Sequence, residues 1–181
     1  VELTTAGGVF SPEHLDVGTA VLLRSVPPPP PEGALLDLGC GWGPVALSLA
    51  LHSPGADVWA VDVNERAVEL TRDNAAALGL TRVRACLPDD VPTEANFAAI
   101  WSNPPIRVGK AALHELLARW LPRLLPGGTA YLVVAKALGA DSLARWITSE
   151  LGMPCERIAN DKGFRVLAVA QPEGHPPLHD R

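Results

Sequence analysis

Two short runs of residues in this chain have the composition of ligand-binding loops. The first, residues 39–43, reads Gly-Cys-Gly-Trp-Gly and follows the apolar segment 34–38, which contains Asp37. The apolar segment predicts a buried parallel strand, and residues 45–51 predict the helix that follows the glycines. A glycine-rich turn between a strand and a helix lets the backbone approach a nucleotide-like ligand. We therefore predict a cofactor loop here, with Asp37 accepting hydrogen bonds or facing a positively charged group.

The spacing of these glycines argues against two common nucleotide-binding loops. Gly39, Gly41 and Gly43 are spaced Gly-x-Gly-x-Gly, whereas the dinucleotide fingerprint is Gly-x-Gly-x-x-Gly. The loop also lacks the Lys-Ser/Thr pair that ends a phosphate-binding P-loop.

A carboxylate follows the second apolar segment of the chain. Residues 57–61 predict a strand, and Asp62 comes directly after it, where a carboxylate can bind both hydroxyls of a ribose. Aspartate is also a good helix N-cap, but Asn64 can take that role for the helix predicted over 65–78. We therefore predict that Asp62 binds a ribose.

The second distinctive run is Asn103-Pro104-Pro105, at the end of the apolar segment 97–102. Ligands bind at the carboxyl ends of strands in an open α/β sheet. The Asn103 carboxamide oxygen and the Pro104 carbonyl can each accept one N–H from a planar amine, whose delocalised lone pair makes it a poor nucleophile. Proline has no competing N–H, and its fixed φ holds the direction of the carbonyl. Asn-Pro is also a common turn signal, so this run alone predicts only a rigid turn.

Together, the two runs predict methyl transfer from S-adenosylmethionine to an exocyclic or amide nitrogen. Positioning and electrostatics would then supply most of the rate. No strong base is required, because the amine proton becomes acidic only after the methyl group has been added. The predicted catalytic residues are Asn103, Pro104 and Pro105.

On these residues the chain resembles the methyltransferase small domain family, and within it the RsmC-like ribosomal RNA guanine-N2 methyltransferases. The resemblance extends roughly from Gly8 to Val169, and its matching stretches are residues 8–11, 15–19, 37–43, 102–110, 136–140 and 162–166. It implies a class I methyltransferase fold, S-adenosylmethionine as methyl donor and guanine in small-subunit ribosomal RNA as acceptor. Relatives with an additional N-terminal region imply that this chain, which begins at Val1, is a piece of a longer protein.

The resemblance and the strand-end positions give a set of candidate binding residues. Those expected at the cofactor are Asp37, Gly39, Cys40, Gly41, Asp62, Val63, Leu87, Asp89 and Asn103, and those expected at the acceptor are Ile106, Arg107, Lys110 and Lys136. Asp89 and Asp90 both follow the third predicted strand, and either can meet the adenine amine. Phe10 and Ser11 can close over the cofactor, and Thr19 can touch its carboxylate.

Two positions depart from the family's pattern. Ile106 stands where many amine methyltransferases have an aromatic residue on which the target base stacks, although one branch also has Asn-Pro-Pro-Ile-Arg. Ala98 stands where relatives often have an acidic residue. The acceptor therefore stays open between guanine N2, adenine N6 in nucleic acid and glutamine N5 in a translation factor. A non-catalytic, cofactor-binding half of a duplicated enzyme is a further alternative.

Composition fits one α/β domain. The chain has 181 residues, a hydrophobic content of 48% and a mean hydropathy of +0.15. We expect a doubly wound, mostly parallel seven-stranded sheet with an antiparallel last strand. The expected methyltransferase domain covers residues 1–170, including an N-terminal segment and proline-rich linker over 1–33, and residues 171–181 are expected to be a disordered tail. Further helices are predicted over 14–26, 111–124 and 141–151, and further strands near 83, over 129–135, 155–159 and 164–170.

Charge and cysteine content narrow the class of partner. The net charge of −5 argues against broad electrostatic binding of nucleic acid but leaves room for a local basic rim. Three cysteines without a Cys-x-x-Cys pair indicate reduced thiols and a cytoplasmic protein, and no metal site is expected. No apolar stretch is long enough to span a membrane. The expected partner is ribosomal RNA or the assembled small subunit, with the protein a monomer or a weak homodimer.

Overall fold

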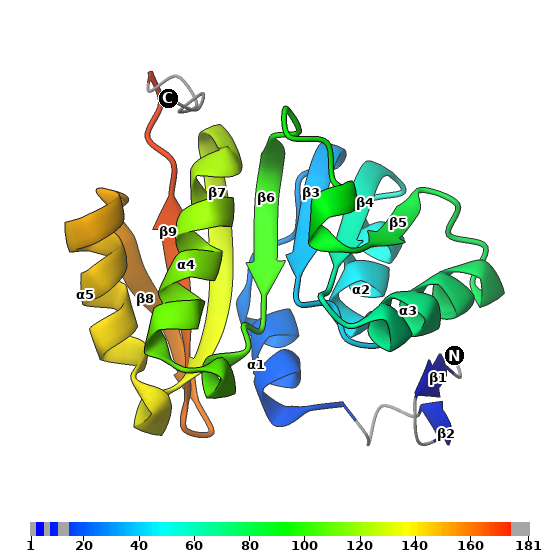
Figure 1. Cartoon of the computed structure of the whole chain (residues 1–181), viewed down its shortest axis with the longest axis horizontal. Helices are drawn as coiled ribbons and strands as arrows, with labels where there is room; N and C mark the ends of the chain where they lie inside the picture. The colour runs from blue at the N-terminus through cyan, green and yellow to red at the C-terminus, as the bar shows by residue number, and fades with distance from the viewer. Residues whose placement is uncertain (1–2, 6–7, 11–14, 175–181) are drawn as a thin grey trace.

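A seven-stranded sheet covered by helices on both faces forms the body of the protein (Figure 1). The computed structural model describes residues 3–5, 8–10 and 15–174, with only the backbone for the first two ranges. The strands of the sheet are β3 (Glu32–Leu38), β4 (Gly55–Val61), β5 (Val83–Cys86), β6 (Phe97–Ser102), β7 (Leu124–Ala135), β8 (Cys155–Asp161) and β9 (Phe164–Ala170).

The strands lie in the order β5-β4-β3-β6-β7-β9-β8. Strands β3 to β7 pair in parallel, and β9 is antiparallel to both of its neighbours. This arrangement confirms the predicted fold class, including the antiparallel last strand. A separate two-stranded hairpin, β1 (Leu3–Thr5) with β2 (Gly8–Phe10), was not predicted.

Helices pack on the two faces of the sheet and bury its apolar strands. The helices are α1 (Val17–Ser25), α2 (Pro44–His52), α3 (Glu65–Ala77), α4 (Lys110–Trp120) and α5 (Ala140–Leu151). One core cluster joins the sheet to α1, α2 and α3, and the other joins it to α4 and α5. Because most strands are covered on both faces, their sequences are nearly continuous apolar runs, which is why they could be found in the sequence.

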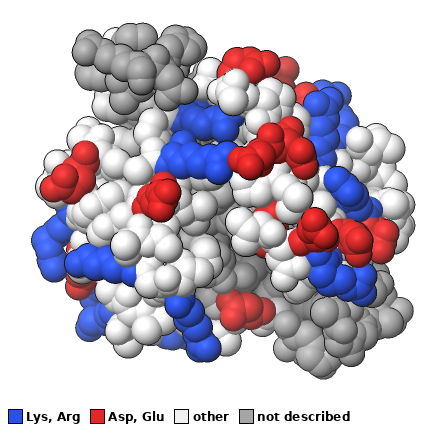
Figure 2. All heavy atoms as spheres, in the orientation of Figure 1, with Lys and Arg blue, Asp and Glu red and all other residues white. Residues whose placement is uncertain are grey.

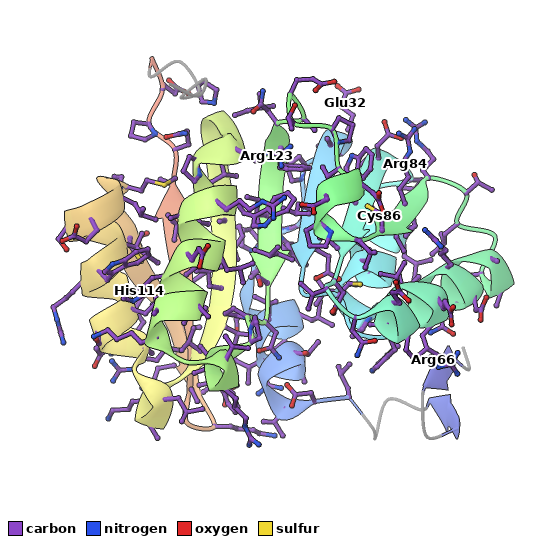
Figure 3. The ribbon with its side chains drawn as sticks, in the orientation of Figure 1. Glu32, Arg66, Arg84, Cys86, His114 and Arg123 are labelled. Carbon is purple, nitrogen blue, oxygen red and sulfur yellow. The ribbon has the colours of Figure 1, made fainter. Side chains whose placement is uncertain are left out.

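The connection from β5 to β6 has a 3-10 turn, η2 (Pro88–Asp90), in place of a helix. Arg123 anchors this connection to the end of α4 (Figure 3). Its Nε donates to the Ala95 carbonyl at 3.0 Å, and its guanidinium lies over the rings of Phe97 and Trp120. These contacts cover the core beneath the connection, where a helix would otherwise be needed.

Two predicted element ends are wrong. The helix expected over 111–124 ends at Trp120 and continues only as a 3-10 turn, because Pro122 has no N–H to extend the α-helical ladder. Strand β7 then begins at Leu124, before its predicted start at residue 129, and includes the segment 126–128. That segment is held in the strand by Gln171, which exchanges backbone hydrogen bonds with Gly127 and Gly128.

The starts of α5 and α1 also differ from the predicted starts at residues 141 and 14. Gly139, with a φ of 100°, is the N-cap of α5, whereas Asp141 lies in the first turn and pairs with Arg165 of β9. Helix α1 begins at Val17, with Asp16 as its N-cap. The predicted start of this helix at residue 14, the predicted role of Ser11 and the end of the tail, 175–181, lie outside the described residues.

Helix α1 is fixed to the turn between β8 and β9. A Cβ atom at Gly18 would lie 2.9 Å from Cε1 of Phe164, so only glycine allows the helix to approach this closely. Arg24, at the other end of α1, forms an ion pair with Asp161 at 2.5 Å. The segment that precedes the sheet in sequence is therefore held by the last two strands.

A substitution at Gly43 can test how closely the glycine loop packs against α3. Gly43 has a φ of 102°, and a Cβ there would lie 2.9 Å from Cγ2 of the buried Thr71. We expect Gly43→Ala to lower the free energy of unfolding by about 1–3 kcal/mol more than Gly79→Ala. Gly79 is the matched control because its φ is 67° and no atom lies within 4 Å of its Cβ position. Urea denaturation measures both; equal losses would contradict the close packing.

Candidate cofactor and acceptor site

The two chemically distinctive runs of the sequence lie next to each other at one edge of the sheet. Strands β3 and β6 pair in parallel with Leu38 opposite Ser102, and Ser102 Oγ donates to the Leu38 carbonyl at 2.6 Å. The residues that follow are therefore neighbours: the Cβ position of Gly39 lies 3.7 Å from the Asn103 carbonyl oxygen. The predicted cofactor loop and the predicted acceptor residue share one site.

The glycine loop is held by the end of β4. The backbone N–H groups of Gly39 and Cys40 both donate to the Val61 carbonyl, at 2.8 and 3.0 Å. The next donor, Gly41 N–H, is bound by Asp62 Oδ2 at 3.0 Å. These bonds fix the loop before any ligand is present.

Of the two roles considered for Asp62, the N-cap of α3 belongs to Asn64. Asn64 is the N-cap of α3, and its side chain accepts from the N–H groups of Arg66 and Ala67. Asp62 Oδ1 accepts from Asn64 N–H at 2.9 Å, and Oδ2 accepts from Gly41. An ionised carboxylate has about four acceptor positions. Asp62 therefore keeps capacity for ligand hydroxyls while it supports the loop.

Helix α3 supports the other side of the glycine loop through two residues that sequence reasoning missed. Thr71 and Asn74 are buried, at 0% and 1% exposure, and lie on one face of the helix. Thr71 Oγ1 donates to the Gly41 carbonyl, and Asn74 Nδ2 donates to the Trp42 carbonyl, both at 2.9 Å. The Cys40 thiol is buried against Thr71, so this predicted cofactor residue directs its side chain into the core.

Asp37 lies beneath the loop and is 1% exposed. Its Oδ2 accepts from the Ala46 N–H of α2 at 3.0 Å. Burial raises the pKa of the Asp37 carboxyl from 3.8 to about 8, although the Ala46 hydrogen bond opposes the increase; the nearby Asp62 carboxylate adds to it. A positive charge above this carboxyl would favour its ionised form.

Asn103 is held by the N-cap and the first turn of α1. Its Nδ2 donates to Asp16 Oδ2 at 2.9 Å and to Thr19 Oγ1 at 3.1 Å. The sequence singled out Thr19 for a cofactor carboxylate, and the structure instead shows its hydroxyl on Asn103. Asp16 received no predicted role, because nothing in the sequence indicates a contact between positions 87 residues apart.

The candidate acceptor residues line the same edge. Pro104 is buried, Pro105 is exposed, and Ile106 begins the 3-10 turn η3 (Ile106–Val108) before α4. Ile106 also lines a cavity of about 150 Å³ between α4 and α5, together with Lys110.

Four cations lie along this edge. Arg107 is in η3, Lys110 begins α4, Lys136 follows β7 in η5 (Lys136–Leu138), and Lys162 is in the β8–β9 turn. The Lys136 N–H donates to the Gly163 carbonyl, which joins two of these segments. None of the four has a carboxylate within 4 Å among the described residues. Lys and Arg side chains accordingly spread around the N-terminal ends of α4 and α5, at the lower left of Figure 2.

The remaining candidates lie at the ends of β4 and β5. Val63 is 79% exposed at the tip of β4, and Leu87 is half-buried after β5. These two strand ends are joined by a hydrogen bond from Asp62 N–H to the Cys86 carbonyl at 3.3 Å. The Asp89 carboxylate is exposed and pairs with Arg119 in the last turn of α4, at 3.1 Å. Asp90 is exposed beside it.

The part of the chain that the structure describes contains neither a candidate metal site nor a candidate membrane-spanning helix. No group of three or more His, Cys, Asp or Glu side chains there could bind a metal ion. None of its helices is both long enough and apolar enough to span a bilayer.

Comparison with known proteins places the chain in a family. The model of the methyltransferase small domain matches residues 1–168. The Bacillus subtilis protein YbxB is 36% identical over 167 residues, which are 91% of this chain and 83% of that protein. Ribosomal RNA small subunit methyltransferase C of Pseudomonas aeruginosa is 37% identical over 175 residues, which are 93% of this chain and 51% of that protein. The chain thus spans about half the length of the latter relative.

Solved structures agree on the fold. The T. thermophilus 16S rRNA N2 G1207 methyltransferase (RsmC), in complex with AdoMet and guanosine, superposes with a TM-score of 0.75 at 24% identity, over 94% of this chain and 50% of that one. A methyltransferase from Pyrococcus furiosus superposes with a TM-score of 0.66 at 22% identity, over 90% and 87%. The chain therefore belongs to the methyltransferase small domain family, a family of S-adenosylmethionine-dependent enzymes.

Proposed function

We propose that this methyltransferase acts on the exocyclic N2 amine of a guanine in small-subunit ribosomal RNA. The observation that carries the proposal is the position of Asn103 against the glycine loop. Its backbone carbonyl oxygen lies 3.7 Å from the position that a Cβ atom would take at Gly39. Ribosomal RNA is supported by the relatives named ribosomal RNA small subunit methyltransferase C, at 37% identity, and guanine N2 by the similar structure of the T. thermophilus 16S rRNA N2 G1207 methyltransferase. The substrate is free RNA or the assembled subunit, in the cytoplasm.

The residues of the glycine loop fit S-adenosylmethionine. No atom lies within 4 Å of the Cβ position of Gly41, so the backbone there faces open space that a ligand can fill. Asp62 has remaining acceptor positions for ribose hydroxyls, and the exposed Val63 offers an apolar surface for adenine. The cofactor would supply an electrophilic methyl group on a sulfonium. Asp37 lies beneath the loop as a buried carboxyl that a cationic ligand would favour in its ionised form.

The acceptor amine would be oriented by Asn103 and Pro104. The Asn103 carboxamide oxygen and the Pro104 carbonyl accept the two N–H groups of the amine, which turns its lone pair toward the methyl donor. Such positioning supplies rate without a strong base. A guanine in folded RNA has to leave its stack to enter this site. The adjacent cavity, lined in part by Ile106 and Lys110, provides room beside it.

The charge distribution supports RNA as the substrate. Five arginines form ion pairs with carboxylates of this protein: Arg24, Arg66, Arg82, Arg119 and Arg165. By contrast, the four cations along the acceptor edge have no such partner among the described residues and remain free for phosphates. RNA can therefore be attracted to this edge although the net charge is −5.

Incubation with radiolabelled S-adenosylmethionine tests the proposal. The substrates would be small-subunit ribosomal RNA, assembled small subunits, large-subunit RNA, adenine-containing DNA and a glutamine-containing translation factor. Mass spectrometry of the nucleosides and of the protein identifies the product. We expect N2-methylguanosine in small-subunit RNA or subunits. Formation of N6-methyladenosine, or of its deoxy form in DNA, would show that adenine N6 is the acceptor, the alternative that Ile106 leaves open. Cofactor binding without transfer to any of these substrates would instead indicate a non-catalytic module.

Two alanine variants should separate acceptor binding from cofactor binding. Asn103→Ala removes an acceptor for the amine, so we expect kcat to fall by roughly 10²–10³-fold while the Kd for S-adenosylmethionine stays nearly unchanged. Asp62→Ala removes the ribose acceptor and a support of the loop, so we expect that Kd to rise about tenfold or more. Calorimetry and initial rates measure both. Parallel losses of affinity and turnover in the two variants would contradict the division of roles.

The buried Asp37 should make stability depend on pH. Between its ordinary pKa of 3.8 and the raised value of about 8, the unfolded state loses the Asp37 proton while the folded state keeps it. The folded state then binds more protons, so stability falls as pH rises through this range. Asp37→Asn retains an acceptor for Ala46 N–H and cannot ionise. We expect the free energy of unfolding of the cofactor-free variant to fall less than that of the wild type between about pH 5 and about pH 8.

Asp57→Asn is the matched control for this comparison. Asp57 is near the start of the neighbouring strand β4 and is part-exposed, with its carboxylate 3.3 Å from Arg82. Urea titrations at the two pH values compare wild type with each variant. A pH dependence that is identical in wild type and Asp37→Asn would rule out the buried carboxyl as its source.

A further inference from the structure

We propose that Asp16 is a positioning residue that, with Thr19, sets the rotation of the Asn103 carboxamide. In this rotation the carboxamide oxygen faces away from α1 and is presented to the acceptor amine. The catalytic consequence rests on the function proposed above. The contact itself belongs to the free protein and can be measured without any substrate.

The two ends of a carboxamide have nearly the same shape but opposite hydrogen-bonding character. If Asn103 were rotated by a half turn, its NH2 group would meet the acceptor amine and could not accept from it. Packing alone distinguishes poorly between the two rotations, and a hydroxyl does not distinguish either, because Thr19 Oγ1 can both donate and accept. A further group is therefore needed to select one rotation.

The Asp16 carboxylate makes this selection. Ionised, it has only acceptors, and its Oδ2 lies 2.9 Å from Asn103 Nδ2. The opposite rotation would bring the carboxamide oxygen against a negatively charged oxygen, with no proton between them. With Asp16 settling the direction, Thr19 Oγ1 accepts at 3.1 Å as a second partner of the same nitrogen. Both partners bind Nδ2, so the oxygen is the end left for the acceptor amine.

The carboxylate is itself held in place by the start of α1. Asp16 Oδ2 also accepts from the Thr19 N–H at 3.1 Å, and a negative charge is stabilised at a helix N-terminus. Helix α1 is in turn fixed by the close approach of Gly18 to Phe164 and by the Arg24–Asp161 ion pair. The orientation of Asn103 thus depends on contacts with the last two strands of the chain.

The capping and orienting roles of Asp16 can be separated by substitution. Asp16→Ser retains a good N-cap but has a shorter side chain that does not reach Asn103. Asp16→Asn keeps an oxygen of the same reach and should restore part of the effect. Val17→Ala is the control, since Val17 is the neighbouring residue in the same helical turn and is 49% exposed. We expect Asp16→Ser to lower kcat by about 10- to 100-fold, with the Kd for S-adenosylmethionine and the melting temperature nearly unchanged.

Nuclear magnetic resonance reads the contact directly. The side-chain amide signals of Asn103, identified by their loss in Asn103→Ala, should exchange slowly with solvent in the wild type and in Val17→Ala. We expect the exchange to accelerate by about tenfold in Asp16→Ser. Unchanged shifts and exchange in Asp16→Ser would overturn the proposal, whatever the substrate of the enzyme.

A double-mutant cycle then tests the effect on catalysis. If Asp16 acts through Asn103, Asp16→Ser should cause little further loss in the Asn103→Ala background. A full additional loss would overturn the positioning role. Should the wild type methylate no amine at all, the proposed function fails, whereas the resonance experiment still decides whether Asp16 orients Asn103.

Discussion

The parallel pairing of β3 with β6 is the constraint on which the rest of the site depends. Strand β3 is followed by α2 on one face of the sheet, and β6 is followed by α4 on the other, so the two connections diverge from adjacent strands. Such a switch point opens a crevice at the carboxyl ends of the strands. The Ser102–Leu38 hydrogen bond fixes the register at the mouth of this crevice. A shift of one residue would separate Asn103 from the glycine loop and turn its side chain to the opposite face.

Around that pairing, the support of the site comes from segments far apart in the chain. The glycine loop is held by Asp62 after β4 and by Thr71 and Asn74 on α3, whereas Asn103 is held by α1. The side that faces the cofactor is therefore fixed mainly by the first half of the sheet. The side that faces the acceptor depends on α1 and on the β8–β9 turn against which α1 packs. The second, antiparallel half of the sheet thus has a role at the site as well as in the core.

Sequence reasoning located the strands and singled out the two candidate runs because their signals are local. Apolar runs buried on both faces, a glycine loop and Asn-Pro-Pro are each contained within a few neighbouring residues. The end of α4 was misjudged because Leu121 and Leu124 continue the apolar pattern of the helix, although both are buried after the helix has ended. Thr71 and Asp16 could not be found this way. Thr71 is a buried polar residue within a helix, and Asp16 is an exposed helix N-cap. Neither has a sequence signature that identifies its partner, which lies 30 positions away for Thr71 and 87 for Asp16.

A net negative charge is compatible with an RNA substrate because some cations of the protein form ion pairs with its own carboxylates and others do not. Five arginines are neutralised by carboxylates of the same protein, so they add little to the field beyond about 8–10 Å at physiological salt. Four of the cations without such a partner among the described residues border the acceptor crevice, and the phosphates of an approaching strand would be attracted there while acidic surfaces elsewhere repel them. Few phosphate contacts supply little non-specific affinity. For the proposed substrate, discrimination among RNA sites would therefore come from the crevice, where the orientation of the Asn103 carboxamide would decide which edge of a base can be bound.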